Sequence, residues 1–294
     1  MGAVAAAGTE ISGGIEGYAH LRHLVRERTG FDLTNYKDRF IERRVAIRLR
    51  ATRHEGLGDY LRFLSREHDE MDRLLRCLTI HVSSFFRNAS TFEAINAQVF
   101  PHLLAPGAGR HPRFWSVGCS RGEEPYSLAI LAHEYLGAAR RGWDVQIHAI
   151  DVDDQVLVEA KAAEYGWHQV ADLSPARRER YFIHEERWRV VPEIRRMVHF
   201  SRGDILMSPP AGEYDFILCR NLLIYLERPG QELVLEGFAR CLRPGGFLVL
   251  GRTEVFVGAS REAFEVVDTC ERIYRRLRAD EAASSAGGAH RGTS

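Results

Sequence analysis

Two adjacent carboxylates, Glu123 and Glu124, stand at a predicted junction between a strand and a helix. The aromatic and β-branched run at 114–117 is typical of a buried strand, and Gly118 and Gly122 bracket the loop that follows. A helical pattern begins directly after this loop. Glycines at such a junction let the backbone approach a ligand, and the N-terminus of the helix faces that ligand. The stretch is therefore a candidate ligand-binding loop of an α/β domain.

The charge of this loop argues against phosphate as the ligand. Anions are stabilised at helix N-termini, so a phosphate-binding loop should not carry two carboxylates there. Neither GxxxxGK[ST] nor a GxGxxG after a strand occurs, which disfavours nucleotide triphosphatases and dehydrogenases. The carboxylates favour a ligand with a positive end and no phosphate. S-adenosylmethionine, with its amino group and sulfonium, fits this description.

Two further polar segments follow predicted strands. Asp151 comes directly after the strand at 145–150, and Arg220 and Asn221 come directly after the strand at 214–219. An acidic residue at the tip of the second strand, about 30 residues past the loop glycine, is where such folds hold a ribose diol. Alternatively, Asp151 caps the helix that begins near 153, and Asn221 caps a turn. Together with the loop at Gly118, Asp151 and the pair Arg220 and Asn221 make three polar segments at strand ends, and this combination favours a binding site.

The chain divides into an all-helical section and an α/β section. Helical patterns at 18–28, 35–53, 58–65 and 69–80 predict an N-terminal helical domain over 15–90, and 91–112 reads as a linker helix and loop. The α/β domain covers 113–278. Within it, short strands at 188–191 and 197–200 around a turn at Pro192 predict a small inserted β-subdomain at about 166–200. Strands at 264–267 and 272–277 predict a closing antiparallel hairpin. Residues 1–14 and 279–294 are predicted to be disordered.

Composition excludes several classes of function. The formal net charge is zero, so no global attraction to nucleic acid is expected. No apolar run approaches the ~20 residues of a membrane span, and the N-terminus lacks the features of a signal peptide, so we expect a cytoplasmic protein without membrane insertion. Five dispersed cysteines without a CxxC pair predict neither a disulfide framework nor a metal site.

The helix at 35–53 is strongly basic. The helix contains two acidic residues, Asp38 and Glu42. It contains seven basic residues, namely Lys37, Arg39, Arg43, Arg44, Arg48, Arg50 and Arg53. Such a run is usually a solvated face. The excess also makes this helix a candidate docking surface for an acidic partner.

Several stretches together resemble one family. They are the helix at 31–50, SSFFR at 83–87, FWSVGCSRGEEPYSLAI at 114–130, AIDVD at 149–153, FILCRNLLIYL at 216–226 and LRPGGFLVLGRTE at 242–254. In this order they resemble the chemoreceptor glutamate O-methyltransferases of the CheR type, over roughly residues 15 to 278. The resemblance implies a helical domain followed by a Rossmann-like class I methyltransferase domain with a small inserted β-subdomain. It also implies methyl transfer from S-adenosylmethionine to receptor glutamates, giving glutamyl methyl esters and S-adenosylhomocysteine.

The resemblance assigns roles by position. Arg87 and Tyr225 would line the point of methyl transfer, although Tyr225 could equally be a packed tyrosine. Cofactor contacts would come from His81, Ser83, Arg87, one of Glu123 and Glu124, Asp151, Asp204, Ile205, Asn221 and Leu222. On the basic helix, Lys37, Arg44 and Arg48 would contact the acidic helical region of a chemoreceptor.

The chain departs from the family pattern at three residues and in one loop. The family usually has Asn and Thr where this chain has His81 and Ser83, and Asn is common where Asp204 stands. The loop at 182–188 lacks the extra glycine-containing residues of members that bind a receptor C-terminal pentapeptide, so we predict no such tether. A monomer is expected. Two alternatives stay open: a methyltransferase of another protein or a small molecule, and a non-enzymatic S-adenosylmethionine-binding signalling adaptor.

Overall fold

The computed structural model describes residues 14–105, 111–207, 212–278 and 281. The chain divides into two compact units, Met1–Ile80 and His81–Ser294. The predicted disordered ends, apart from Gly14 and Glu281, and most of the predicted linker loop lie outside the described residues. Segment 81–90 belongs to the second unit, whereas the sequence suggested that the helical domain reaches residue 90. The reason is packing, because Phe85 contacts Tyr165 and Phe182 at ring-centroid distances of 4.8 and 5.1 Å.

The described part of the first unit is helical, as predicted. Its helices are α1 (Ile15–Thr29), α2 (Asp38–Thr52), α3 (Leu57–Leu64) and α4 (His68–Leu78). In α2, Ile41, Val45 and Leu49 recur every fourth residue and are buried, so they form the apolar stripe that packs into the unit.

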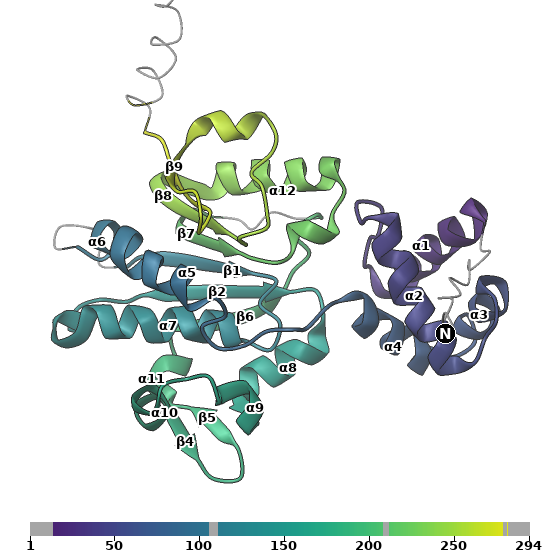
Figure 1. The fold of residues 1–294 in the computed structure, drawn as a ribbon, viewed down its shortest axis with the longest axis horizontal. Helices are drawn as coiled ribbons and strands as arrows, with labels where there is room; N and C mark the ends of the chain where they lie inside the picture. The colour runs from purple at the N-terminus through teal and green to yellow at the C-terminus, as the bar shows by residue number, and fades with distance from the viewer. Residues whose placement is uncertain (1–13, 106–110, 208–211, 279–280, 282–294) are drawn as a thin grey trace, which may run out of the picture. The chain divides into compact units, whose positions relative to one another are not determined.

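The second unit is built on a seven-stranded sheet of order β6-β2-β1-β7-β8-β10-β9 (Figure 1). β6, β2, β1, β7 and β8 are mutually parallel, and β10 pairs antiparallel with both of its neighbours. The predicted hairpin is thereby confirmed as β9 and β10. The strands are β1 (Arg113–Val117), β2 (Gln146–Asp151), β6 (Val198–Arg202), β7 (Tyr214–Cys219), β8 (Leu242–Leu250), β9 (Phe264–Asp268) and β10 (Ile273–Arg276).

Helices cover both faces of the sheet. On one face Phe114 of β1 stacks with Phe100 at a ring-centroid distance of 6.0 Å. On the other face Trp115 meets Phe238 of α12 edge-on at 5.4 Å. Successive strand residues point to opposite faces, so this alternation explains why β1 is apolar throughout. The helical segments are α5 (Ala89–Ala94), η1 (Ile95–Val99), α6 (Phe100–Leu103), α7 (Glu123–Leu136), η2 (Gly137–Arg140), α8 (Asp154–Ala162), η3 (Leu223–Tyr225), α12 (Arg228–Cys241) and η4 (Ala259–Ala263).

A small second sheet of order β3-β5-β4 forms the inserted β-subdomain. It contains β3 (Glu164–Tyr165), β4 (Phe182–His184) and β5 (Trp188–Val190), with α9 (Trp167–Val170), α10 (Pro175–Tyr181) and α11 (Pro192–Arg195) beside it. One prediction was wrong. Residues 197–200 do not form a hairpin with 188–191, because Pro192 begins α11 and Val198–Arg202 joins the main sheet parallel to β2.

Candidate functional site

The candidate site lies where three adjacent parallel strands end. Val117, the last residue of β1, pairs with Ile150 of β2 and Cys219 of β7. The backbone N–H of Gly118 donates to the carbonyl oxygen of Ile150 at 2.9 Å, which closes the loop after β1 against β2. The structure therefore brings together the three strand-end segments that the sequence singled out. Open α/β sheets bind ligands at this edge.

The loop between β1 and α7 requires glycine for two reasons. Gly118 has φ +69°, and a Cβ there would lie 2.8 Å from the Leu222 side chain. Gly122 has φ +91°, and a Cβ there would lie 3.1 Å from the Phe200 ring. Left-handed backbone of this kind favours glycine, and the missing side chains let two loops approach each other. Between them, the buried hydroxyl of Ser120 has no hydrogen-bond partner among the described atoms.

Asp151 holds the loop after β1 in place. Its Oδ2 accepts the backbone N–H of Ser120 at 2.9 Å, and its Oδ1 accepts that of Asp153 at 3.2 Å. The carboxylate is 8% exposed, and this burial raises its pKa. The alternative that Asp151 caps the next helix is wrong. Asp153 is the cap of α8, because its side chain accepts the N–H of Gln155.

The two carboxylates of α7 point to different neighbours. Glu124 lies 3.2 Å from Nη1 of Arg220 and accepts a long hydrogen bond from Ser116 at 3.4 Å, so it stands between the ends of β1 and β7. Burial raises its pKa to about 7, although the Arg220 guanidinium opposes the shift. Glu123 instead accepts from Gln169 of α9 at 3.0 Å, which ties α7 to the β-subdomain. Burial raises the pKa of Glu123 as well.

Arg220 connects three segments of the site, namely the end of β7, α7 and residues 87–88. Besides Glu124, its Nη2 donates to the backbone oxygen of Arg87 at 2.9 Å and to the side chain of Asn88 at 2.7 Å. The Arg87 side chain donates to the Val82 carbonyl at 2.8 Å. Since Arg220 is fully buried and multiply bonded, it fixes the predicted catalytic segment 83–87 against the ends of β1 and β7.

Glu254 is a site residue that the sequence reasoning missed. It is 2% exposed, and its carboxylate accepts the backbone N–H groups of five residues, which are Asn221, Leu222, Leu223, Ile224 and Gly251. Asn221 has φ +59°, so this carboxylate holds a tight, left-handed turn directly after β7. The only sequence signal was an acidic residue just after the β8 strand in LRPGGFLVLGRTE.

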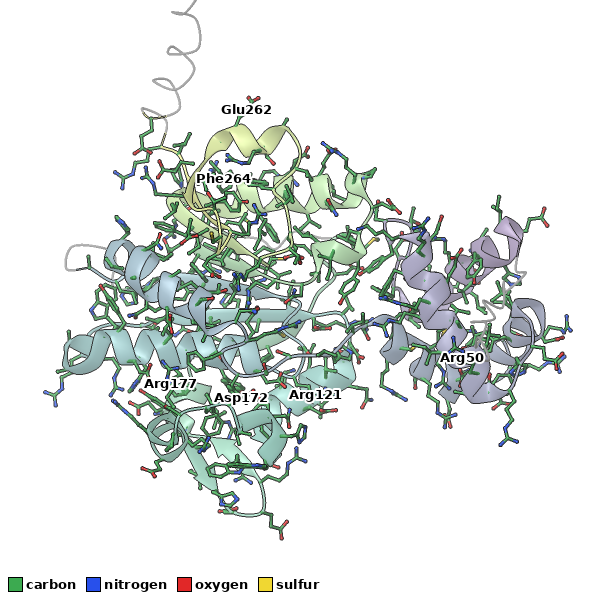
Figure 2. The ribbon with its side chains drawn as sticks, viewed as in Figure 1. Arg50, Arg121, Asp172, Arg177, Glu262 and Phe264 are labelled. Carbon is green, nitrogen blue, oxygen red and sulfur yellow. The ribbon has the colours of Figure 1, made fainter. Side chains whose placement is uncertain are left out.

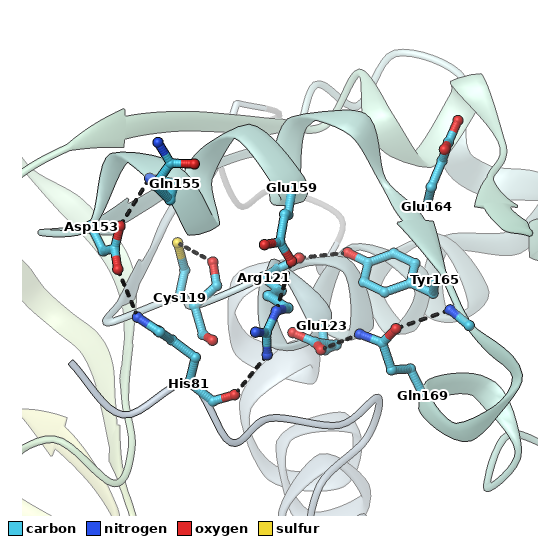
Figure 3. A network of polar contacts seen from close by, with 12 residues as sticks. His81, Cys119, Arg121, Glu123, Asp153, Gln155, Glu159, Glu164, Tyr165 and Gln169 are labelled. Atoms are coloured by element: carbon cyan, nitrogen blue, oxygen red, sulfur yellow. Dashed lines mark hydrogen bonds and ion pairs between the residues drawn. The ribbon is translucent and has the colours of Figure 1, made fainter. Parts of the chain in front are cut away.

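A second polar network lies between β2, α8 and the β-subdomain (Figure 3). The His81 ring contacts Asp153 at 3.0 Å through Nε2, and the His81 backbone oxygen accepts from Arg121 at 3.0 Å. Arg121 also pairs with Glu159 at 2.7 Å, and its backbone oxygen accepts from the Tyr165 hydroxyl at 2.8 Å. His81 thereby anchors the segment before SSFFR to the end of β2.

The other predicted site residues lie near these strand ends. The backbone N–H of Gly203 donates to the Asp151 oxygen at 3.0 Å, which places Asp204 and the buried Ile205 beside β2. Tyr225 is half-buried and ends η3. Ser83 is half-buried in the extended segment after His81. No cluster of three or more His, Cys, Asp or Glu side chains that could hold a metal occurs among the described residues.

The predicted receptor-binding residues belong to the first unit and do not share one environment. Arg48 forms two hydrogen bonds with Glu70, at 2.9 and 2.7 Å, and the Tyr60 hydroxyl donates to the same carboxylate at 2.8 Å. The Glu70 side chain is 1% exposed, so Arg48 neutralises a buried charge. We therefore remove Arg48 from the candidate docking surface. Lys37 and Arg44 are half-buried.

The strand order, with one antiparallel strand next to the edge, and the glycine loop facing Asp151 define a class I S-adenosylmethionine-dependent methyltransferase. Family models agree with this class. Residues 81–273 match the model described as "CheR methyltransferase, SAM binding domain", and residues 16–79 match "CheR methyltransferase, all-alpha domain". The chain belongs to the CheR methyltransferase family, and S-adenosylmethionine is its cofactor.

Relatives named chemotaxis protein methyltransferase match most of the chain. The chain is 34% identical over 238 residues to a chemotaxis protein methyltransferase of Listeria innocua, covering 81% of this chain and 89% of that protein. It is 34% identical over 261 residues to the chemotaxis protein methyltransferase of Klebsiella aerogenes, covering 84% and 86%. The solved N-methyltransferase NodS from Bradyrhizobium japonicum aligns with a TM-score of 0.39 at 16% identity, covering 67% and 90%. The family assignment therefore rests on the sequence matches.

The residues present fit this cofactor. The buried Ser120 hydroxyl, which has no partner among the described atoms, offers a polar atom, and the loop that holds it carries no side chain at Gly118 or Gly122. Carboxylates, which suit hydroxyl and ammonium groups, line the strand ends at Asp151 and Glu124. No helix in the described part of the chain is long and apolar enough to span a membrane.

Proposed function

We propose that the protein transfers the methyl group of S-adenosylmethionine to glutamate side chains on the acidic helical region of chemoreceptors. The products are glutamyl methyl esters and S-adenosylhomocysteine. The chemotaxis names of the relatives support the substrate class. The observation that carries the proposal is a run of exposed arginines on α2, within the same chain as a methyltransferase site, because a small-molecule enzyme would not need them.

The α2 helix carries basic residues on two sides. Arg39, Arg43 and Arg50 are exposed and spaced by four and seven residues, so they share one face, and Figure 2 labels Arg50 there. None of the three forms a salt bridge with a described carboxylate. Lys37, Arg44 and Arg48 fall on a different, half-buried side. We infer that the exposed arginine face makes the main contact with the receptor, and that Lys37 and Arg44, on the other side of the helix, contribute less.

We assign the cofactor contacts by their surroundings. Glu124 would hold the ammonium end, because it stands between the ends of β1 and β7, while Oε1 of Glu123 accepts from Gln169 and its Oε2 has no partner among the described atoms. Asp151 would accept the ribose hydroxyls. The turn at Asn221 and Leu222, His81, Ser83, Asp204 and Ile205 would complete the pocket.

The protein contributes to this reaction mainly by positioning the reacting groups. The bound cofactor supplies a methyl group activated by a sulfonium. A glutamate side chain has a pKa of ~4.3, so it is ionised at neutral pH and needs no general base. Its oxygen forms the new bond to carbon as the carbon–sulfur bond breaks, and no proton moves. Arg87 and Tyr225 would orient the carboxylate, with the reacting atoms about 3–3.5 Å apart.

A transfer assay tests this function. The protein is incubated with S-adenosylmethionine labelled in the methyl group and with a soluble cytoplasmic fragment of a chemoreceptor, and modified residues are mapped by mass spectrometry. We expect labelled glutamates. Calorimetry with S-adenosylhomocysteine accompanies the assay. Cofactor binding without transfer to any receptor would instead favour a signalling adaptor.

We also propose that the receptor is recognised without a C-terminal pentapeptide tether. The connection between β4 and β5 contains only Glu185, Glu186 and Arg187, which leaves little loop to hold a peptide. Titration with such a pentapeptide should show no saturable binding. Micromolar binding would overturn this point while leaving the methylation proposal intact.

A further inference from the structure

A pocket of about 420 Å³ lies between α7, α8, α11 and β6, at the amino-terminal end of β6. The ends of α8 and α11 place Lys161, Arg195 and Arg196 around it, and β6 adds His199. Tyr126 and Phe200 also line it. The strand-end site lies at the opposite, carboxyl end of β6, so this pocket is separate from the cofactor site.

No acidic residue neutralises this pocket from within its lining, although Arg196 lies close enough to Glu193 to help lower the pKa of that carboxyl. Lys161, Arg195 and Arg196 form no salt bridge with a described carboxylate. The neighbouring acids are already paired, since Glu193 contacts Arg140 and Asp154 contacts Arg202. Three like charges around one hollow repel each other, and a bound anion would relieve that repulsion.

We propose that this pocket binds a small, multivalent, phosphate-bearing anion. Its volume suits a small ligand. Guanidinium groups donate in pairs to phosphate oxygens, and two arginines with a lysine match several such oxygens. An acidic helix would need an extended stripe of charge, which a single hollow does not provide.

The walls of the pocket reach the cofactor loop. The rings of Tyr126 and Phe200 meet edge-on at 5.5 Å, and a Cβ at Gly122 would lie 3.1 Å from Phe200 and 3.2 Å from Tyr126. Arg195 donates to the backbone oxygen of Lys161 at 3.4 Å across the pocket. An anion bound by these cations would restrict the motion of Tyr126 and Phe200, the side chains that pack against Gly122. Bound anion should therefore raise the affinity for S-adenosylhomocysteine by about fivefold.

Calorimetry with pyrophosphate tests the site. At a fixed ionic strength of about 0.15 M, which screens non-specific attraction, wild-type protein should bind pyrophosphate saturably and more tightly than citrate. The double variant K161A/R196A removes two exposed cations and should weaken binding by about tenfold or more. The matched control R141A/R240A removes the same charge elsewhere in the unit and should bind normally. Thermal unfolding checks that all variants are folded.

Three results would overturn the proposal: no saturable pyrophosphate binding, equal loss in the control variant, or citrate binding as tight as pyrophosphate. The coupling has its own readout. Saturating pyrophosphate should tighten S-adenosylhomocysteine binding in the wild type and not in K161A/R196A. An unchanged affinity in the wild type would refute the coupling.

Discussion

The Glu254 carboxylate accepts the backbone N–H of Leu223 at 2.7 Å, across 31 residues of sequence. Four more N–H groups share this carboxylate, so one buried anion holds the turn that follows β7. Replacing Glu254 with Gln substitutes a donor for one acceptor and sets it against N–H groups. We expect E254Q to bind S-adenosylhomocysteine about tenfold or more weakly, measured by calorimetry below its unfolding temperature. E262Q, at an exposed position labelled in Figure 2, is the control, and equal affinities in both variants would argue against this role.

Substitution of each α7 carboxylate in turn should distinguish the roles of Glu123 and Glu124 in cofactor binding. We expect E124Q to weaken S-adenosylhomocysteine binding by about tenfold, since it removes a charge held beside Arg220 at the strand ends. E123Q should change affinity little, because Glu123 serves the contact with Gln169. Calorimetry on both variants decides, and the opposite order of effects would reverse the assignment.

Cofactor affinity should depend on pH through Glu124. Burial raises its pKa to about 7, so the carboxyl is protonated and neutral below that pH in the ligand-free protein. An ammonium group binds the ionised form, so affinity should rise as the pH is raised from about 6 to about 8, and then level off. The E124Q variant should lose this dependence. A flat wild-type profile would show that Glu124 does not hold the charged end.

Arg87 should matter for transfer more than for folding. Its side chain donates to Val82, and its backbone is held by Arg220, so R87A keeps the backbone anchor. We expect turnover to fall by about 100-fold or more, because small misplacements of reacting groups cost that much. R141A, an exposed arginine away from the strand ends, should be unaffected. Near-normal turnover in R87A would refute its assigned role.

The exposed arginine face of α2 should set receptor affinity. We expect R39A/R43A/R50A to raise the KM for a receptor fragment by about tenfold and to leave S-adenosylhomocysteine binding unchanged. The control R62A/R66A/R76A removes three other exposed arginines of the same unit. If both triples raise KM equally, general charge and not this face would explain the effect. K37A/R44A should raise KM less, because Lys37 and Arg44 are half-buried on the other side of the helix.

Local sequence patterns predicted the positions of helices and strands better than they predicted which strands pair with each other. The helices of the first unit and the strand ends at Gly118, Asp151 and Arg220 follow from apolar periodicity and glycine placement, which are local signals. The strand Val198–Arg202 was assigned to the wrong sheet because its partner β2 lies about 50 residues earlier in the chain. Nothing near Pro192 distinguishes a hairpin turn from the start of a short helix.

The contacts of buried charged side chains were also not predicted from the sequence. Arg48 resembled one more charge on a solvated helix, and only the fold shows that Glu70 neutralises it. Glu254 was likewise invisible, because its partners are backbone groups of a distant segment. Side chains that bind backbone leave no complementary residue in the sequence, so their role appears only once the turn is in place.

The most direct test of the central claim is the release of volatile label from a receptor fragment. After incubation with methyl-labelled S-adenosylmethionine, mild base should liberate labelled methanol from the receptor, because carboxyl methyl esters hydrolyse under conditions that leave N-methyl groups intact. Substituting the mapped glutamates with alanine should abolish the release. Label that resists base, or no label on any receptor while S-adenosylhomocysteine binds normally, would contradict glutamate methylation.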